Sequence, residues 1–480
     1  MPNISAKRFE FIGHALRGDG PFRPVVTDRG LNSVEVQLSG LSYLVRYSRE
    51  SDAKFARRNQ IAYYASPLAR AAGRFVGYLS MKPPARELPN AQYIAIADNV
   101  DGKGNAVDVF FADFAVNAKA RGSMLLLVDM PQSLPQNQAE QLRSRGLPFW
   151  SPIVPEIVSD YAIGDDGRFD YVEFAGKWTS PEGEQKECTW RFTRTDWSAS
   201  DKHGKPLAGS PHMLGECPVL IFTESGDFPC FGNFSAIAEL ARALFNRQSE
   251  RDEILRAQTF SLLTMQVPEE STSEQKISAA QVAGETIGTS NLMVHSGSTP
   301  AFIAPPDGPA RTYKETIAEV KAEIDEVALN VATVNAQESG IAMRMRFQAL
   351  NGELSSFATR LEDLERRAWE LSRRWMQMQQ SPSVNWPRDF NISDIGQELK
   401  VLADMQSAGM PAEVIAEQQK RIVGLQFGGL DVERKDELIA AIDERTLEPP
   451  ASGDNVVPLR PDPNAEVRGA IVRALGNAGS

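Results

Sequence analysis

Two short segments of this sequence have the serine and lysine spacing used in covalent acyl transfer. Residues 51–54 (SDAK) and 273–276 (SEQK) fit the pattern Ser-x-x-Lys, in which a lysine lies beside a serine nucleophile. That chemistry also needs Ser-Asp-Asn and Lys-Thr-Gly elements, and the sequence contains neither. A nucleophile elbow of the form Gly-x-Ser-x-Gly is absent as well. We therefore interpret both segments as coincidental matches.

The residue types that bind metals and phosphates are scattered or wrongly spaced. Residues 101–105 (DGKGN) lack the GxxxxGK[ST] spacing of a phosphate loop, and they are predicted to form a turn. Residues 164–170 (GDDGRFD) lack the alternating oxygen ligands and the distal glutamate of a calcium loop, which favours a hairpin turn. The histidines have no ligand-like spacing and are expected at the surface or in satisfied core positions; they are His14, His203, His212 and His295. No metal and no cofactor are predicted.

One pair of carboxylates has a spacing that could serve acid–base chemistry. Glu362 and Glu365 lie three residues apart, but the predicted helix that carries them is also rich in arginine. A solvated or salt-bridged face is the expected role of such a pair. The sequence thus predicts that the protein is not an enzyme, which favours a function in assembly.

Size and composition are typical of a globular protein with several modules. The chain has 480 residues, 42% of them hydrophobic and 24% charged, and a length of this order suggests roughly two to four domains. No apolar run is long enough to span a bilayer, and the N-terminus has no signal-peptide pattern, so a cytosolic protein is expected. Three cysteines without a CxxC pair predict free thiols. The formal charge of −12 disfavours a protein that grips nucleic-acid phosphates.

The elements that would position any functional residue begin with a mixed region over residues 1–233, so the fold class is α+β. Residues 53–79 are predicted to be helical with a break at Pro67, and residues 123–131 to form a buried strand. Two strands joined by a turn at Asp165, Asp166 and Gly167 are expected next, followed by a further strand over residues 188–197.

Long helices with a small insertion follow this region. An amphipathic helix is predicted over residues 234–264, ending near Met265 to Pro268. Residues 265–310 favour a small module with a short helix around Ala279 and two strands, LMVH and AFIA. Residues 311–333 repeat apolar positions at spacings of three and four, which predicts a second helix.

The polar segment 334–343 interrupts the helical pattern before a very long helix begins. The apolar repeat that resumes at Phe347 is out of phase with the repeat that ends at Val334, so we predict two helices that meet at a loop. The second helix is expected from Met343 to Gln380, and the segment assigned to it with its continuation is 344–390. Gly340 would permit a turn in the loop. A long sustained repeat indicates packing along a helical seam or between subunits.

A compact set of helices is predicted after this, over residues 391–450. One helix would be capped near Ser393 and end at Gly409, one would start at Pro411, and one would follow Asp431 as its N-cap. Residues 451–480 read as a tail with a short amphipathic helix.

In this order of parts, and in three local stretches, the chain resembles the portal proteins of tailed bacteriophages. The stretches are ARRNQIAYYASPLARAAGRFVGYLSMKPP (56–84), FADFAVNAKARGSMLLLVDMP (111–131) and PVLIFTESGDFPCFGNFSAIAELARALFNRQSERDEIL (218–255). The resemblance covers nearly the whole chain.

The resemblance implies an architecture and a function. Its parts would be a wing (1–233 and 344–390), two stem helices (234–264 and 311–333), a clip (265–310), a tunnel loop (334–343) and a helical crown (391–450), assembled as a ring that is twelve-fold in the virion. The ring would occupy one capsid vertex and form the channel for double-stranded DNA packaging and ejection. The expected partners are the major capsid protein, the terminase large subunit, head-completion adaptor or tail proteins, and the passing DNA. Assembly would take place in the host cytoplasm and the final location would be the virion.

The residues that would line the channel follow from the same resemblance. The tunnel loop and channel set comprises Asn335, Gln337, Glu338, Ser339, Gly340, Arg344 and Arg346, and the stem channel candidates are Lys314, Glu319, Lys321 and Glu323. Arg344 and Arg346 are either local basic positions facing DNA or partners of acidic residues of the neighbouring subunit. Four acidic residues of the preceding helix favour the second role, namely Glu319, Glu323, Asp325 and Glu326.

A second interpretation comes from the long helices alone. A non-viral oligomeric scaffold or adaptor with a coiled-coil hairpin would explain the heptad pattern, with segment 334–343 as a surface turn. It would not explain the β-containing insertion between two helices.

Overall fold

The structure is a computed structural model. It describes residues 3–28, 36–48, 50–131, 146–180, 183–259, 262–266, 292–295, 302–303, 308–328, 340–390, 395–426 and 432–447. The chain divides into two compact units, Met1–Asn391 and Ile392–Ser480. Helices and sheets both occur in the first unit, which confirms the α+β class. The predicted tail, residues 451–480, lies outside the described residues.

A three-stranded sheet lies at the centre of the first unit. Its order is β11 (Val219–Thr223), β4 (Ser123–Asp129) and β5 (Phe149–Ile153), all antiparallel. Strand β4 is the buried strand that the sequence predicted, and it is apolar at nearly every position because both of its faces are covered. One face packs against helices α5 (Val107–Arg121) and α10 (Gly340–Trp375).

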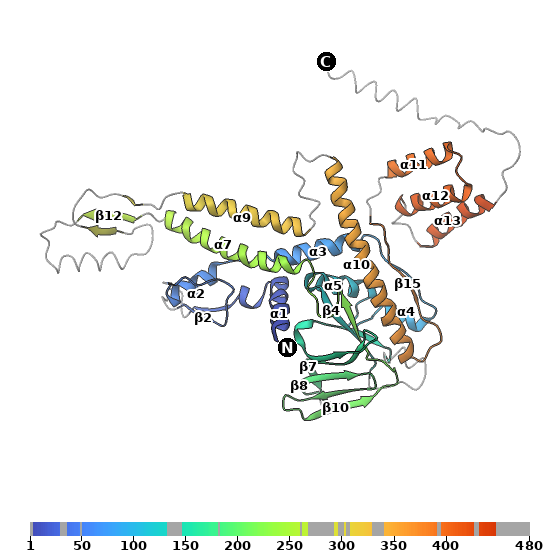
Figure 1. The fold of residues 1–480 in the computed structure, drawn as a ribbon, viewed down its shortest axis with the longest axis horizontal. Coiled ribbons are helices and arrows are strands. Elements are labelled where there is room, and N and C mark those ends of the chain that lie inside the picture. Colours follow the sequence, from blue (N-terminus) through green and yellow to red (C-terminus); the bar gives the residue numbers. More distant parts are fainter. Residues whose placement is uncertain are drawn as a thin grey trace, which may run out of the picture. The chain divides into compact units, whose positions relative to one another are not determined.

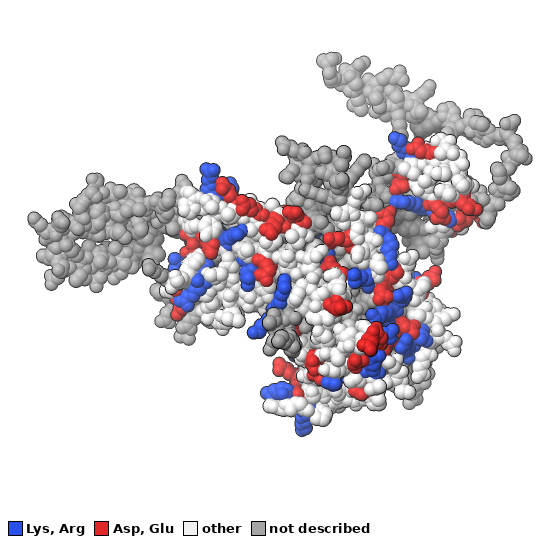
Figure 2. All heavy atoms as spheres, in the orientation of Figure 1, with Lys and Arg blue, Asp and Glu red and all other residues white. Residues whose placement is uncertain are grey.

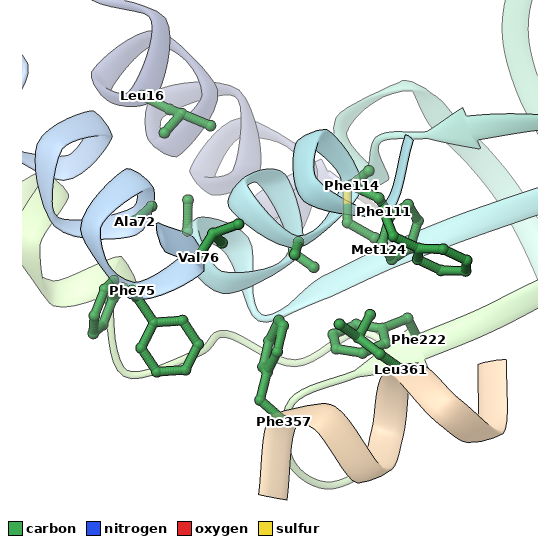
Figure 3. Packing of buried hydrophobic residues seen from close by; sticks show 14 of the residues in the cluster. Leu16, Ala72, Phe75, Val76, Phe111, Phe114, Met124, Phe222, Phe357 and Leu361 are labelled. Atoms are coloured by element: carbon green, nitrogen blue, oxygen red, sulfur yellow. The ribbon is translucent and has the colours of Figure 1, made fainter. Parts of the chain in front are cut away.

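Figure 3 shows the core on this helix-covered face. Phe111 and Phe114 of α5 and Phe357 and Leu361 of α10 meet at the sheet, where Phe222 of β11 lies between them. The ring centroids of Phe222 and Phe357 are 5.3 Å apart in an edge-on arrangement. This packing fixes the middle of α10 on the α/β core.

A five-stranded meander covers the other face of the central sheet. Its strands, in the order β10-β9-β8-β7-β6, are β6 (Val158–Ile163), β7 (Phe169–Thr179), β8 (Gln185–Thr193), β9 (Asp196–Ser200) and β10 (Pro206–Pro211). The predicted pair of strands around the Asp165–Gly167 turn is confirmed as β6 and β7. The single strand expected over residues 188–197 is wrong: Thr193 Oγ1 accepts the backbone N–H groups of Thr195 and Asp196, and this turn separates β8 from β9.

The N-terminal region is helical around two short ladders. Its elements are α1 (Asn3–Arg17), a 3-10 turn (Gly20–Phe22), β1 (Val25–Asp28), β2 (Val36–Ser39), α2 (Asp52–Ile61), α3 (Pro67–Leu79), β3 (Ala85–Glu87) and α4 (Ala91–Ala97). A second 3-10 turn (Pro155–Ile157) lies between β5 and β6. The predicted break at Pro67 is confirmed, since this proline is the first residue of α3.

Two long helices, α7 (Ser235–Thr259) and α9 (Gly308–Val327), run side by side in Figure 1. The helix predicted to end near residues 265–268 ends earlier, because Leu262–Gln266 form strand β12 instead. Strand β12 pairs in parallel with β13 (Leu292–His295) and antiparallel with β14 (Phe302–Ile303). The strands LMVH and AFIA are thus confirmed, while the helix expected around Ala279 lies outside the described residues.

Helix α10 differs from its prediction at both ends. It starts at Gly340, so this glycine is the first helical residue and the predicted turn at Gly340 is wrong. It ends at Trp375 rather than Gln380, because the chain adopts a positive φ of 53° at Gln377. Strand β15 (Ser383–Asn385) then pairs with β3.

The second unit contains three described helices, as predicted. They are α11 (Ile395–Ser407), α12 (Ala412–Gln426) and α13 (Val432–Leu447). Gly409, at a φ of 68°, ends the first, and Pro411 precedes the first helical residue of α12 instead of being that residue. Lys420 Nζ lies 2.6 Å from Asp443 Oδ1, which links α12 to α13. Ser393 and Asp431 lie outside the described residues.

Candidate functional site

The paired helices α7 and α9 are held together in a defined orientation. Ile317, Val320 and Ile324 of α9 are buried, and their spacing of three and four places them on the face that meets α7. Tyr313 Oη donates to Glu250 Oε2 at 3.0 Å, and Arg247 donates to the Thr316 carbonyl oxygen. The opposite side of α9 carries exposed side chains in the described part of the chain.

The four residues predicted to line a stem channel all lie on α9 with exposed side chains. Lys314, Glu319, Lys321 and Glu323 have no ion-pair partner in the part of the chain that the structure describes. The structure brings them onto one helix but not into one cluster, because residues 314, 319, 321 and 323 point in several directions around its axis. Figure 2 shows acidic side chains along the exposed side of this helix.

The predicted tunnel-loop residues Asn335, Gln337, Glu338 and Ser339 lie outside the described residues. Arg344 and Arg346 belong to the first two turns of α10, so the MRMR segment is helical. That α9 and α10 are two separate helices, as the phase change predicted, is confirmed by their bounds. The predicted extension of the first helix to residue 333 is wrong, since α9 ends at Val327 and Ala328 is in a turn.

A buried carboxylate anchors the second half of α10, and this role escaped the sequence reasoning. Glu365 is fully buried, and its carboxylate accepts from Arg86 Nε at 2.5 Å and from the indole N–H groups of Trp369 at 3.1 Å and Trp386 at 2.8 Å. The salt-bridged role expected of Glu365 is correct, but its expected place on a solvated face is wrong. Burial alone would lower the pKa of Arg86, yet its hydrogen bonds to Glu365 and Asp108 outweigh this and raise it. The only sequence signal was that Glu365 lies next to Leu364, on the side of the predicted helix that carries its apolar repeat.

A buried lysine anchors the first half of α10. Lys119 of α5 is 1% exposed and pairs with Glu224 and with Glu353 of α10, the latter at 3.1 Å. Its Nζ also lies 4.4 Å from the ring centroid of Phe75 and 4.5 Å from that of Phe234. The Lys119 charge, held by two carboxylates and two rings, thus joins α3, α5 and α10 to Phe234, the residue directly before α7.

Two tryptophans complete the anchoring of α10. Trp150 Nε1 donates to Ser372 Oγ at 3.0 Å, and Trp375 Nε1 donates to the Val128 carbonyl oxygen at 3.0 Å. Both bonds reach the central sheet from the end of the helix. The later turns of α10 are therefore a rigid part of the α/β core, and its first turns continue from that fixed base toward Gly340.

Comparisons with known proteins identify similar solved structures but no family. No family model matches this sequence, and no curated protein matches it. One similar chain comes from the virion of a native gene transfer agent (GTA) particle, with 10% identity over 78% of this chain and 89% of that one, at a TM-score of 0.38. Another comes from the neck of an empty GTA particle computed with C6 symmetry, with 13% identity, coverage of 78% and 90%, and a TM-score of 0.40. A third, from the neck of a native GTA particle computed with C12 symmetry, has 12% identity, coverage of 78% and 89%, and a TM-score of 0.37.

The residues that first suggested chemistry have local structural roles. Ser51 Oγ accepts the backbone N–H of Lys54, so the first Ser-x-x-Lys segment is the N-cap of α2; the second lies outside the described residues. Residues 101–105 form the predicted turn, in which Asp101 accepts the N–H groups of Lys103 and Asn105. Among the described residues no group of three potential ligands could hold a metal ion, and no helix is long and apolar enough to cross a membrane.

The predicted free thiols are confirmed. Cys188 and Cys217 are buried and Cys230 is half-buried, and none forms a disulfide. Burial raises the pKa of the Cys217 thiol to about 12, which keeps it protonated at neutral pH. Two histidines have hydrogen-bond contacts: His14 Nδ1 lies 3.1 Å from the Tyr43 hydroxyl, and His212 Nε2 lies 3.2 Å from the Thr193 carbonyl oxygen. His212 is only partly satisfied, because its buried Nδ1 has no hydrogen-bond partner among the described residues.

A groove of about 450 Å³ lies between β11 and α10. Its charged side chains already have neighbours: Arg360 donates to the Thr223 carbonyl oxygen, and Asp363 accepts from Arg366. The remaining lining groups are hydroxyls and apolar side chains, at Ile221, Phe222, Thr223, Ser356, Thr359 and Leu364.

Proposed function

We propose that this chain is a portal protein, a subunit of a ring at one capsid vertex through which double-stranded DNA is packaged and ejected. The observation that carries the proposal is the arrangement between residues 235 and 327. Two long helices, α7 and α9, leave the α/β core as a pair, and between them the chain forms the small sheet of β12, β13 and β14. A coiled-coil hairpin of a scaffold protein would need only a short turn at that place.

The parts of the proposed portal are assigned as follows. The wing comprises residues 1–233 and α10 with its continuation to residue 390. The stem comprises α7 and α9, the clip lies around β12, β13 and β14, and the crown comprises α11, α12 and α13. Segment 334–343 is the tunnel loop, with its last residues in the start of α10.

The anchoring of α10 supports this assignment. A loop that contacts moving DNA needs a rigid base, since a flexible base would transmit no force between the loop and the ring. Lys119 and Glu365 fasten the two halves of α10 to the core through buried ion pairs. The segment that precedes α10 is thus continued on one side by a helix that buried ion pairs fasten to the core.

The charge of the chain is compatible with a DNA channel. Each phosphate contact made by a basic residue adds affinity through counterion release, and strong affinity would oppose sliding. A chain with a formal charge of −12 avoids that friction along most of a lumen. The proposed role is mechanical and not enzymatic.

The proposed partners follow from the role. The chain would form a homo-oligomer, expected to be a dodecamer in the particle, and would contact the major capsid protein around its rim. The terminase large subunit and later a head-completion adaptor or tail protein would dock at the clip. The location would be the portal vertex of a virion after assembly in the host cytoplasm.

Negative-stain electron microscopy of the purified full chain tests the proposal. A ring with a central hole wide enough for a DNA duplex is the expected result. Rods would favour the coiled-coil scaffold, and compact monomers at all concentrations and salt conditions would also overturn the portal function. The presence of a hole is more informative than the subunit number.

A further inference from the structure

Five charged side chains of α9 are exposed and have no ion-pair partner among the described residues: Lys314, Glu319, Lys321, Glu323 and Glu326. Elsewhere on the same helix, Arg311 and Glu315 pair with each other at 3.2 Å. Asp325 has an interaction of its own. Five of the eight charged residues of α9 are therefore without an ion-pair partner among the described residues.

The unpaired charges are sorted by sign around the helix. At about 100° per residue, Lys314 and Lys321 differ by only about 20°, so they form one flank. Glu319 and Glu323 each lie about 160° from Lys321, with Glu326 beside Glu319. The face buried against α7 separates these two flanks on one side. On the other side they are separated by Ala318, Ala322, the Arg311–Glu315 pair, whose charges cancel, and Asp325, which lies about 40° from Lys321 and has an interaction of its own.

We propose that the two flanks of α9 bind each other in neighbouring copies of this chain. The lysine flank (Lys314 and Lys321) of one copy would meet the glutamate flank (Glu319, Glu323 and Glu326) of the next. This inference rests on the proposed ring. It assigns Lys314, Lys321, Glu319 and Glu323 to the contact between subunits instead of the channel surface.

The geometry of a ring accounts for this arrangement. A head-to-tail interface uses two different patches of the same molecule, whereas a two-fold dimer uses one patch that matches itself. Two lysines on one patch would repel each other across a two-fold axis, but they complement a patch of glutamates. Along the helix axis Lys321 lies midway between Glu319 and Glu323, about 3 Å from each level. If the α9 helices of neighbouring subunits lie at similar heights along the ring axis, Lys321 of one subunit would thus lie between Glu319 and Glu323 of the next.

Charge reversal tests the inference once wild-type rings have been observed. Lys314→Glu with Lys321→Glu, and separately Glu319→Lys with Glu323→Lys, place like charges across every contact. We expect the assembled fraction at 0.15 M salt to fall at least about tenfold in each double variant, since repulsion of this kind costs more than the 1.4 kcal/mol that a tenfold change requires. The quadruple variant, which exchanges both flanks, should restore assembly. The control Arg311→Glu with Glu315→Lys reverses a pair on the same helix and should assemble normally.

Cross-linking tests the direction of the contact. Lys321→Cys and Glu323→Cys are prepared as separate single variants and treated with a short bismaleimide, with the wild-type chain as the control for the native cysteines. A mixture assembled together should give cross-linked dimers that contain one chain of each variant. Dimers of Lys321→Cys with itself would indicate a two-fold contact and would overturn the inference.

The outcomes separate this inference from the portal function. If the wild-type chain forms no ring, the proposed function fails first. If it forms rings and both reversed double variants form them equally well, the flanks do not meet and only the further inference fails. If the reversed variants form rings of normal stability that retain DNA differently, these residues line the channel instead of the contact between subunits.

Discussion

Arg58 and Glu50 form a buried ion pair with two parallel hydrogen bonds, each 2.9 Å long. Both side chains are 1% exposed. Arg58 also donates to Ser249 Oγ of α7, and its guanidinium lies 4.2 Å from the ring centroid of Tyr47. The pair thus joins α2 to the helix that we assign to the stem.

Removing one partner of this pair should destabilise the protein strongly. Glu50→Ala leaves a buried guanidinium without its counter-charge, and we expect the free energy of unfolding to fall by about 3–5 kcal/mol in urea titrations. Glu184→Ala, which removes the exposed pair with Lys186, is the control and should cost less than about 1 kcal/mol. Equal effects of the two substitutions would contradict the buried role.

Glu365→Ala should loosen the end of α10. The substitution leaves the donors of Arg86, Trp369 and Trp386 without an acceptor, at an expected cost of about 3–5 kcal/mol. Tryptophan fluorescence should change before global unfolding, because two of the donors are indoles. Asp363→Ala, in an exposed pair on the same helix, is the matched control. An unchanged spectrum and stability in Glu365→Ala would show that α10 is not anchored there.

Asp129 should make the protein less stable as the pH rises. Burial raises the pKa of this carboxyl from 3.8 to about 6, although its oxygen accepts the Met130 N–H. A raised pKa in the folded state means that the ionised form is disfavoured there, so the penalty develops between pH 4 and 6 and is complete above pH 6. Asp129→Asn should be more stable than the wild type at pH 8, by up to about 3 kcal/mol, and equally stable below pH 4. If Asp129→Asn stabilised the protein as much at pH 3.5 as at pH 8, the ionised carboxylate could not be the cause of the stabilisation.

The pKa of Glu50 is shifted in the opposite direction. Burial alone would raise it, but hydrogen bonds from Arg58 and from the Tyr47 backbone outweigh burial and lower the pKa. Its contribution to stability is present above the unfolded pKa and is lost as the pH falls through the folded value. The stability difference between Glu50→Ala and wild type should therefore shrink in acid, while the difference for Asp129→Asn vanishes there.

Reversing the charges of Arg344 and Arg346 tests the role predicted for the start of α10. If they pair with acidic residues of the neighbouring subunit, Arg344→Glu with Arg346→Glu should reduce ring assembly in sedimentation and electron microscopy. The control is Arg366→Glu, on the exposed side of the same helix. Normal rings with altered DNA retention in a packaging assay would instead place both arginines at the channel.

The sequence determined the local elements because hydrophobic period and turn residues act over short distances. It predicted the buried strand at 123–129, the break at Pro67, the strands at 292–295 and 302–303, and the change of helix before Phe347. It missed β12. This strand follows a helix directly, and its apolar residues at 262, 263 and 265 look like a continuation of the apolar pattern of that helix. Its partners are supplied by residues about 30 and 40 positions away.

The tertiary structure alone decided which charged residues are buried. From the sequence, Glu365 is expected on a solvated or salt-bridged helix face, and Lys119 is not singled out. Their partners, Arg86 and Glu353, lie 279 and 234 residues away. Such pairs depend on the approach of distant segments, which no local pattern encodes. The same holds for the two flanks of α9: the sequence contains their spacing, but only the packing of Ile317, Val320 and Ile324 against α7 decides which way the lysines and glutamates face.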